Sequence, residues 1–261
     1  MITDNESFVR LSAMLSTALG EHVRGYLTDP NVVEVMANPD GSLWVDRLGA
    51  GREFTGQMLL PESVERAIFI IATSIGAVCS AESPLLSAEL SSFSARFQGV
   101  LPPVSPRPCF SVRKKASKVY ALEDYVGQGV IRDALSKKIK QAVSDRKNIV
   151  IAGGTGSGKT TLANAMLRLI AETGDRLVII EDTLELQCTA KDFVSLRARD
   201  GVTMRDLVRA TMRLRPDRIV IGEVRGGEAL DLLKAWNTGH PGGIATIHAD
   251  SAVKALSRFE Q

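Results

Sequence analysis

Hydrophobic residues in the second half of the chain gather in short, nearly continuous runs that alternate with helical stretches. The runs are NIVIA (148–152), RLVIIE (176–181), RIVIGEV (218–224) and GIATIHA (243–249). Such runs are typical of strands in a parallel sheet, because helices bury both faces of that kind of sheet. We therefore predict an α/β domain with a mostly parallel sheet.

The first half of the chain has a different pattern. In NVVEVMANPDGSLWVDRLG (31–49), two β-branched stretches flank the triplet Pro39-Asp40-Gly41. Proline presets φ and glycine accepts a positive φ, so the triplet predicts the turn of a β-hairpin. From Pro61 to about Cys79, apolar residues recur at steps of three and four, which predicts a helix with Pro61 in its first turn.

A proline-rich segment, LPPVSPRPC (101–109), precedes the boundary between the two patterns. Its four prolines exclude a helix interior or a central strand. The sequence then becomes basic and afterwards rich in turn residues, and we place the boundary near 120–132. Residues 1–125 are predicted to form an N-terminal α+β domain, and residues 126–261 the parallel-sheet domain.

Composition narrows the class of protein without changing the fold. The 261 residues are 44% hydrophobic and 24% charged, as in a globular protein, and the net charge of +2 demands no polyanionic partner. Three scattered cysteines without CxxC spacing argue against disulfides or structural zinc and favour a reducing cytoplasm. The most apolar run (67–79) is shorter than the roughly 20 residues of a membrane-spanning helix, and no secretory signal precedes it.

The strongest chemical signal is GGTGSGKTT (153–161), which follows a predicted strand and meets the phosphate-loop pattern in full. Its glycines let backbone N–H groups point at phosphate oxygens, next to the positive end of a helix that begins near Lys159. Lys159 is expected to neutralise the β and γ phosphates, Thr160 to ligate Mg²⁺ and Thr161 to reach the α phosphate. ATP and Mg²⁺ are the predicted cofactors. The other predicted nucleotide contacts in the loop are Gly154, Thr155, Gly156, Ser157 and Gly158.

Two acidic groups follow predicted strands, at the sheet edge where open α/β sheets bind ligands. VIIEDTLEL places Glu181 and Asp182 at one strand end, with Glu185 just beyond. RIVIGEVRG places Glu223 at another, after a glycine in the position where ordinary Walker B strands carry an aspartate. We therefore expect Glu181 or Asp182 to bind the metal, directly or through a water. We expect Glu223 to orient or activate the attacking water.

The segment NTGHPGGIATIHAD (237–250) holds two of the three histidines, His240 and His248. No acid or cysteine lies between them to complete a metal site. The strand that ends at His248 should deliver this side chain near the phosphates, so we interpret it as a sensor or polar contact there. For His240 two interpretations stay open, a residue of the turn and a second contact near the phosphates.

Arginines follow the helical pattern of TMRDLVRATMRLRPDR (203–218). Arg205 and Arg209 are predicted to lie on a solvated basic face. Arg213, Arg215 and Arg218 are expected close to the acidic strand, within reach of nucleotide or of a neighbouring subunit.

Four segments occur in the order and spacing of the secretion superfamily ATPases, which the chain resembles over about residues 20–261. They are GGTGSGKTT, VIIEDTLEL, MRLRPDRIVIGEVRGGEA and GHPGGIATIHA, similar to the Walker A, Asp, atypical Walker B and His boxes of that family. Upstream, ARFQGVLPPV and FSVRKK are similar to segments that bring arginines onto the terminal phosphate in type IV secretion members. By position these arginines are Arg96 and Arg113.

The resemblance implies a RecA-like C-terminal domain and a homohexameric, Mg²⁺-dependent ATPase, with nucleotide held between the two domains. It is greatest to the ATPases of plasmid conjugation, and so implies energising of conjugative DNA transfer, type IV secretion and mating pilus assembly. The implied place is peripheral at the cytoplasmic face of the inner membrane, with secretion-system membrane components and the coupling protein as partners. No direct sequence-specific nucleic-acid binding is expected. The implied catalytic residues are Glu223, Glu181, Asp182, Lys159 and His248.

This chain ends 13 residues after His248, whereas family members continue with further helical structure. One expectation is therefore that the given sequence is truncated at its C-terminus.

Three other functions stay open. A pilus or type II secretion motor is one, although type II assembly members carry a four-cysteine zinc module that three scattered cysteines do not supply. A nucleic-acid translocase would use VRKKASK (112–118) as a binding strip, but Tyr120 alone supplies an aromatic near it. A nucleotide-binding assembly subunit that barely hydrolyses is favoured by Gly222.

Overall fold

The computed structural model describes residues 4–90, 93–115, 119–199 and 201–258. The chain forms two compact units, Met1–Ser117 and Lys118–Gln261. Helix α4 (Leu122–Gly127) packs on helix α5 (Asp133–Ser144) in the second unit. The boundary predicted after residue 125 therefore lies inside a helix of that unit.

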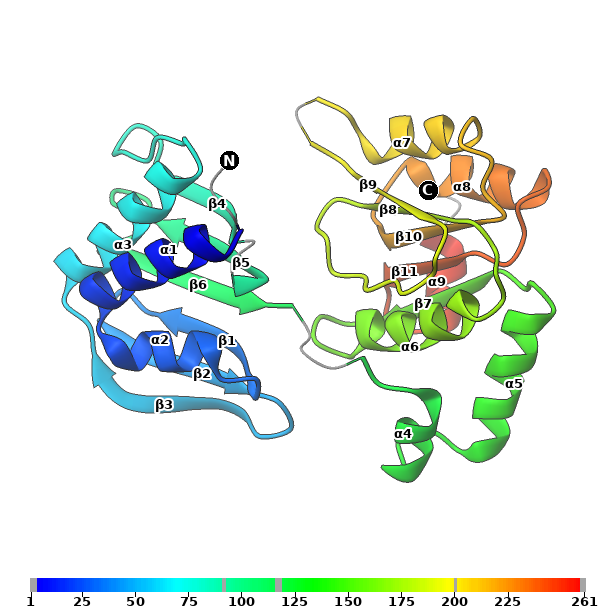
Figure 1. Ribbon diagram of the computed structural model, residues 1–261, viewed down its shortest axis with the longest axis horizontal. Coiled ribbons are helices and arrows are strands. Elements are labelled where there is room, and N and C mark those ends of the chain that lie inside the picture. Colours follow the sequence, from blue (N-terminus) through cyan, green and yellow to red (C-terminus); the bar gives the residue numbers. More distant parts are fainter. Residues whose placement is uncertain (1–3, 91–92, 116–118, 200, 259–261) are drawn as a thin grey trace. The chain divides into compact units, whose positions relative to one another are not determined.

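The described residues of the first unit form a six-stranded antiparallel sheet with three helices on one face (Figure 1). The strand order is β3-β2-β1-β6-β5-β4. Its elements are α1 (Asp4–Leu19), α2 (Glu21–Thr28), β1 (Val32–Ala37), β2 (Ser42–Arg47), β3 (Gly51–Met58), α3 (Pro61–Ser74), β4 (Leu85–Leu90), β5 (Ala95–Val100) and β6 (Cys109–Lys114). The buried apolar residues of the helices and of the covered sheet face form one core.

Two predicted elements of this unit can be compared with the structure. The hairpin prediction is confirmed, because β1 and β2 pair antiparallel across the expected turn. The helix begins at Pro61 as predicted but ends at Ser74 rather than near Cys79. Gly76 has a φ of 68° there, and the N–H of Ala77 bonds to the carbonyl of Ala72, which closes the helix with a left-handed cap.

The second unit is a three-layer α/β structure around five parallel strands in the order β7-β11-β10-β8-β9 (Figure 1). Besides α4 and α5 it contains β7 (Ile149–Gly153), α6 (Lys159–Ala171), β8 (Leu177–Glu181), β9 (Phe193–Arg197), α7 (Met204–Thr211), β10 (Arg218–Val224), α8 (Glu228–Asn237), β11 (Ile244–His248) and α9 (Ala252–Arg258). The predicted fold class is confirmed.

Burial of both sheet faces explains the continuous apolar runs. Leu177 and Ile179 on β8 pack with α5 and α6, whereas Val178 and Ile180 pack with the helices of the other face, which include α7 and α8. Alternate residues of a strand point to opposite faces, so all four must be apolar. Across the described ranges, no helix combines the length and the apolar content needed to cross a bilayer.

A buried ion pair ties together the amino edge of this sheet. The Arg218 side chain, 1% exposed, donates from Nε to Oδ2 of Asp175 at 2.6 Å. Its Nη1 donates to the carbonyls of Val143 at 2.9 Å and Gly242 at 3.3 Å. Arg146 binds the other carboxylate oxygen of Asp175. One guanidinium therefore joins the end of α5, the loop before β8 and the turn before β11.

Arg218 belongs to the acidic strand, as expected, but the expectation that it reaches the nucleotide is wrong. Arg218 is the first residue of β10, and Glu223 is the sixth of its seven residues. The arginine therefore occupies the edge of the sheet opposite to the strand ends that carry the predicted site.

Candidate nucleotide-binding site

The carboxyl edge of the parallel sheet brings most of the predicted residues together. Gly153 ends β7, and His248 ends β11 directly opposite it in register. Glu181 ends β8, and Glu223 lies next to the end of the neighbouring strand β10. Parallel strands end at one edge, which is where open α/β sheets hold their ligands.

The phosphate loop connects β7 to α6 and has the backbone that its glycines predict. Gly158 precedes the first helical residue with a φ of 88°, a left-handed conformation that other residues rarely adopt. Lys159 folds back over the loop, and its Nζ donates to the carbonyl of Gly154 at 2.7 Å. The ammonium group and the positive end of α6 therefore lie at the same loop, an arrangement that can bind phosphate.

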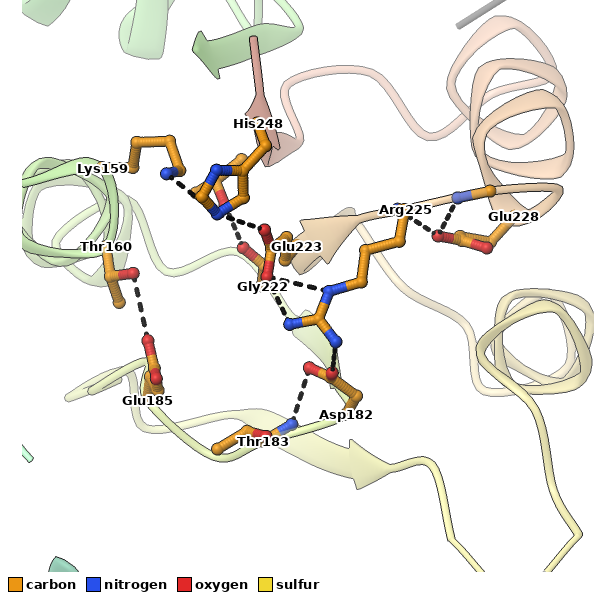
Figure 2. A network of polar contacts seen from close by, with 12 residues as sticks. Lys159, Thr160, Asp182, Thr183, Glu185, Gly222, Glu223, Arg225, Glu228 and His248 are labelled. Carbon is orange, nitrogen blue, oxygen red and sulfur yellow. Dashed lines mark hydrogen bonds and ion pairs between the residues drawn. The ribbon is translucent and has the colours of Figure 1, made fainter. Parts of the chain in front are cut away.

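Thr160 and Glu185 fit a divalent cation beside this loop. The hydroxyl of Thr160, on the first turn of α6, donates to Oε2 of Glu185 at 3.2 Å (Figure 2). Hydroxyl and carboxylate oxygens suit Mg²⁺, which takes only one or two protein ligands when it also binds nucleotide phosphates. Within the described residues no group of three or more His, Cys, Asp or Glu could hold a metal ion by itself.

The structure brings Glu185, rather than Glu181 or Asp182, to Thr160. The Glu181 residue is 2% exposed, and its Oε1 accepts the backbone N–H groups of Glu185 and Leu186, both at 2.8 Å. Its carboxylate thus holds the loop after β8 in place. Glu185 belongs to the predicted acidic group, but its spacing alone does not distinguish it from the two acids before it.

The close approach of Glu181 also accounts for Gly222 at the atypical Walker B position. A Cβ on residue 222 would lie 2.8 Å from Cγ of Glu181, closer than real side-chain atoms approach one another. Because the buried Glu181 fills the space that an aspartate at position 222 would need, glycine is the residue that fits.

Glu223, His248 and Lys159 form a chain of contacts at the strand ends (Figure 2). Nε2 of His248 lies 2.9 Å from Oε1 of Glu223 and 3.4 Å from Nζ of Lys159. A carboxylate can only accept, so Nε2 carries the proton and donates to Glu223, and it cannot then accept from Lys159. His248 therefore lies between the phosphate-loop lysine and the acid expected to act on water, and its hydrogen bond goes to the acid.

Arg225 bridges two carboxylates at the same edge and is not among the residues predicted from the sequence. Its Nε and Nη2 donate to Oε2 of Glu223 at 3.0 and 2.6 Å, and Nη1 donates to Oδ2 of Asp182 at 2.5 Å. Partial burial lowers the pKa of the guanidinium, but the hydrogen bond to Glu223 and the charge of Asp182 outweigh this and leave the pKa raised. The guanidinium is therefore charged where it lies between the two carboxylates (Figure 2).

Glu228, which is also absent from the prediction, holds the backbone of that arginine. It is the first residue of α8 and 8% exposed, and its Oε1 accepts the N–H groups of Arg225 at 2.6 Å and Gly226 at 2.9 Å (Figure 2). A signal for both residues exists in the segment GEVRGGEA, where an arginine and a second glutamate closely follow Glu223.

His240 lies away from this site, at the other end of β11. Its Nδ1 donates to the carbonyl of Pro216 at 2.7 Å. Strand β11 ends at His248 and begins four residues after His240, and its four steps of about 3.3 Å span about 13 Å. The two histidines therefore cannot share a metal ion, and His240 lies in the segment that leads into β11.

Two arginines of α7 pair with an acid of α8 and not with the acids at the strand ends. Arg205 and Arg209 pair with Asp231 on α8 at 2.7 and 3.2 Å, on an exposed face as predicted. Arg213 and Arg215 are exposed in the segment that leads to the amino end of β10.

Arg96 and Arg113 belong to the first unit, on neighbouring strands. They lie opposite one another in the register of β5 and β6, and both are exposed. Their strand neighbours Ala95, Phe97 and Val112 are buried in the core, so the arginines lie on the sheet face away from the helices.

A complete phosphate loop on a parallel sheet defines a P-loop nucleotide-binding protein. Residues 86–261 match the family model described as Type II/IV secretion system protein, and the chain belongs to this family. It is 50% identical to the "Probable conjugal transfer protein TrbB" of Sinorhizobium fredii over 98% of this chain and 79% of that protein. It is 30% identical to the "Type IV secretion system protein VirB11" of Bartonella quintana over 98% of this chain and 83% of that one. The predicted family membership is confirmed.

Solved structures show the same fold at lower identity. The Yersinia pseudotuberculosis ATPase DotB has a TM-score of 0.70 at 18% identity, over 92% of this chain and 66% of that chain. The pilus retraction motor PilT with bound ADP has a TM-score of 0.64 at 18% identity, over 91% and 69%.

Proposed function

We propose that this protein is an ATP-hydrolysing motor that energises type IV secretion in plasmid conjugation. The observation that carries the proposal is the placement of Glu223, held by His248 and Arg225, at the sheet edge that also bears a complete phosphate loop. The similarity to proteins named for conjugal transfer supports the biological context.

Different groups of the phosphate loop bind different parts of the nucleotide in this proposal. Backbone N–H groups donate to phosphate oxygens, Lys159 neutralises phosphate charge, and Thr161 on α6 binds the α phosphate. Thr160 and Glu185 would hold Mg²⁺, supported by their contact at 3.2 Å. When bound there, Mg²⁺ would supply positive charge that neutralises the phosphates.

Glu223 is proposed to orient and activate the attacking water. Each carboxylate oxygen has two acceptor sites. Arg225 fills both sites of Oε2, whereas Oε1 accepts from His248 and keeps one site for a water proton. These two donors hold the carboxylate from both sides. Asp182 contributes through Arg225, whose Nη1 it binds.

Glu223→Gln is expected to lower kcat for ATP about 10²–10⁴-fold, the usual contribution of a general base, while nucleotide affinity changes little because glutamine keeps the shape. Phosphate release with Mg²⁺ or with EDTA, and binding of a fluorescent ADP analogue, measure the two quantities. Arg205→Gln, on the exposed face of α7, is the control. Turnover of the Glu223 variant at the wild-type rate would refute its assigned role.

We propose that His248 senses the state of the phosphates, since it lies between Lys159 and Glu223. His248→Ala is therefore expected to lower conjugative transfer more than ATP turnover. The loss in transfer should exceed the loss in turnover by about 5–150-fold, the usual range of coupling between two sites. A mating assay and phosphate release from the purified protein measure the two effects. His240→Ala at the far end of β11 is the control. Unchanged transfer and unchanged hydrolysis in the His248 variant would leave it a structural residue.

We further propose that the chain works as a homohexamer at the cytoplasmic face of the inner membrane, with the membrane components and coupling protein of the secretion system as partners. Arg96 and Arg113 are proposed to meet the terminal phosphate from the first unit, supported by their paired, exposed positions. Loss of the γ-phosphate charge on hydrolysis would then change the relative stability of domain arrangements and drive movement.

A further inference from the structure

Two carboxylates stand side by side at the carboxyl edge of the sheet. Ile221 on β10 pairs with Ile180 on β8, and Glu223 and Asp182 follow two residues later on each chain segment. Like charges at neighbouring positions repel one another and disfavour a shared orientation. The Arg225 guanidinium lies between them, with bonds of 2.6 Å to Glu223 and 2.5 Å to Asp182.

We propose that Arg225 is a positioning residue with two separable tasks, and this rests on the proposed function. Its planar fork fixes the orientation of the Glu223 carboxylate, and its charge limits the negative potential at the strand ends next to the proposed metal position. Glu228 supports both tasks, because it binds the N–H groups of Arg225 and of the next residue.

The shape of the guanidinium decides the first task. Three N–H donors of Arg225 contact oxygens on two different residues, Glu223 and Asp182. A lysine ammonium is a compact point charge on a flexible stem and cannot reproduce this planar arrangement. Arg225→Lys therefore keeps the charge and loses the geometry, whereas Arg225→Gln loses both.

The surroundings allow these substitutions without disturbing the core. The Arg225 side chain is 61% exposed, and a cavity of about 430 Å³ beside it is lined by Asp182, Glu223 and Glu228. Arg205 lines the same cavity but pairs with Asp231 instead of with the two site acids. Arg205→Gln is therefore a matched control, because it removes an arginine from the same cavity.

The test measures kcat for ATP and, independently of turnover, the binding of Mn²⁺ to the protein–ADP complex by electron paramagnetic resonance. Both Arg225 variants are expected to lose about 10²-fold in kcat, the cost of misplacing a reacting group by about 1 Å. Arg225→Gln is also expected to bind Mn²⁺ about 5-fold more tightly than wild type, because one positive charge near the ion is gone. Arg225→Lys should bind Mn²⁺ like wild type. Arg205→Gln should match wild type in kcat and should change Mn²⁺ affinity less than Arg225→Gln, because Arg205 pairs with Asp231 and not with the site acids.

Each result decides one part of the proposal. Wild-type kcat in both Arg225 variants would overturn the orienting task, and equal Mn²⁺ affinity in Arg225→Gln and Arg225→Lys would overturn the charge task. Equal losses in all three variants would overturn both, because they would reflect a general disturbance of the cavity. Absence of ATP hydrolysis by the wild type would instead contradict the proposed function, while the Mn²⁺ measurement would still test the charge of Arg225.

Discussion

Lys159→Ala is expected to reduce ATP turnover on the order of 10²–10³-fold, the usual effect of removing one preorganised group that stabilises charge in a transition state. In the structure the ammonium contacts a carbonyl of Gly154 and the ring of His248, which are uncharged or already donating, so its charge is available for phosphate. Phosphate release under saturating Mg²⁺ and ATP measures the change. Binding of a fluorescent ADP analogue should weaken as well, because Lys159 also contacts the ground-state phosphates.

The same samples test the oligomeric proposal. Light scattering is expected to find six copies of the 28.1-kDa chain for wild type and for Lys159→Ala, since the lysine lies in the nucleotide loop. A monomer or dimer in both would contradict the hexamer. Wild-type turnover in a correctly folded Lys159 variant would contradict the assignment of the phosphate loop as the hydrolytic site.

Asp175→Asn is expected to lower the free energy of unfolding by about 3–5 kcal/mol, the usual cost of leaving a buried charge without its partner. Arg218, 1% exposed, would keep carbonyl partners but lose the carboxylate at 2.6 Å. Urea unfolding of the full chain measures the loss. Asp192→Asn, which breaks an exposed ion pair with Arg176, should cost no more than about 1 kcal/mol.

The double variant Asp175→Asn/Arg218→Met separates charge from packing. Removing both charges should recover most of the loss, because methionine fills the space without requiring a counter-ion. A double variant that is less stable than Asp175→Asn alone would contradict this explanation.

The contribution of this ion pair also has an expected pH dependence. Burial raises the pKa of Asp175, but hydrogen bonds from Arg218 and Thr173 outweigh it and hold the pKa below 3.8. Because the pKa of Asp175 is lower in the folded than in the unfolded state, its carboxylate stabilises the fold at pH values above the unfolded-state pKa. This contribution is lost as the pH falls through the folded-state pKa. The difference in free energy of unfolding between wild type and Asp175→Asn should therefore become smaller below about pH 4.

Much of the fold follows from local pattern. The four apolar runs correspond to β7, β8, β10 and β11, because strands buried on both faces tolerate few polar residues. Strand β9 (Phe193–Arg197) is absent from the prediction, since it pairs with β8 on one side at the sheet edge and is partly exposed. The strand β3 has a largely exposed, polar sequence and gives no such signal either.

One part of the site also follows from local sequence, and another part depends on contacts made in the folded chain. Glycines and Lys159 of the phosphate loop act within nine consecutive residues, so their backbone conformation depends on near neighbours alone. The choice among the acids after β8 depends instead on how Glu181 folds back onto the N–H groups of its own loop. That contact leaves Glu185, and not the strand-end acids, beside Thr160.

The sequence by itself determined the class of fold, the phosphate loop and the family, because periodicity and glycine spacing are local properties of the chain. Only the tertiary structure decided which charged groups meet. Arg225 and Asp182 are 43 residues apart, and Arg218 and Asp175 are equally distant in sequence. Their pairing follows from the register of β8 against β10, which puts one pair at the carboxyl edge for chemistry and the other at the amino edge for stability.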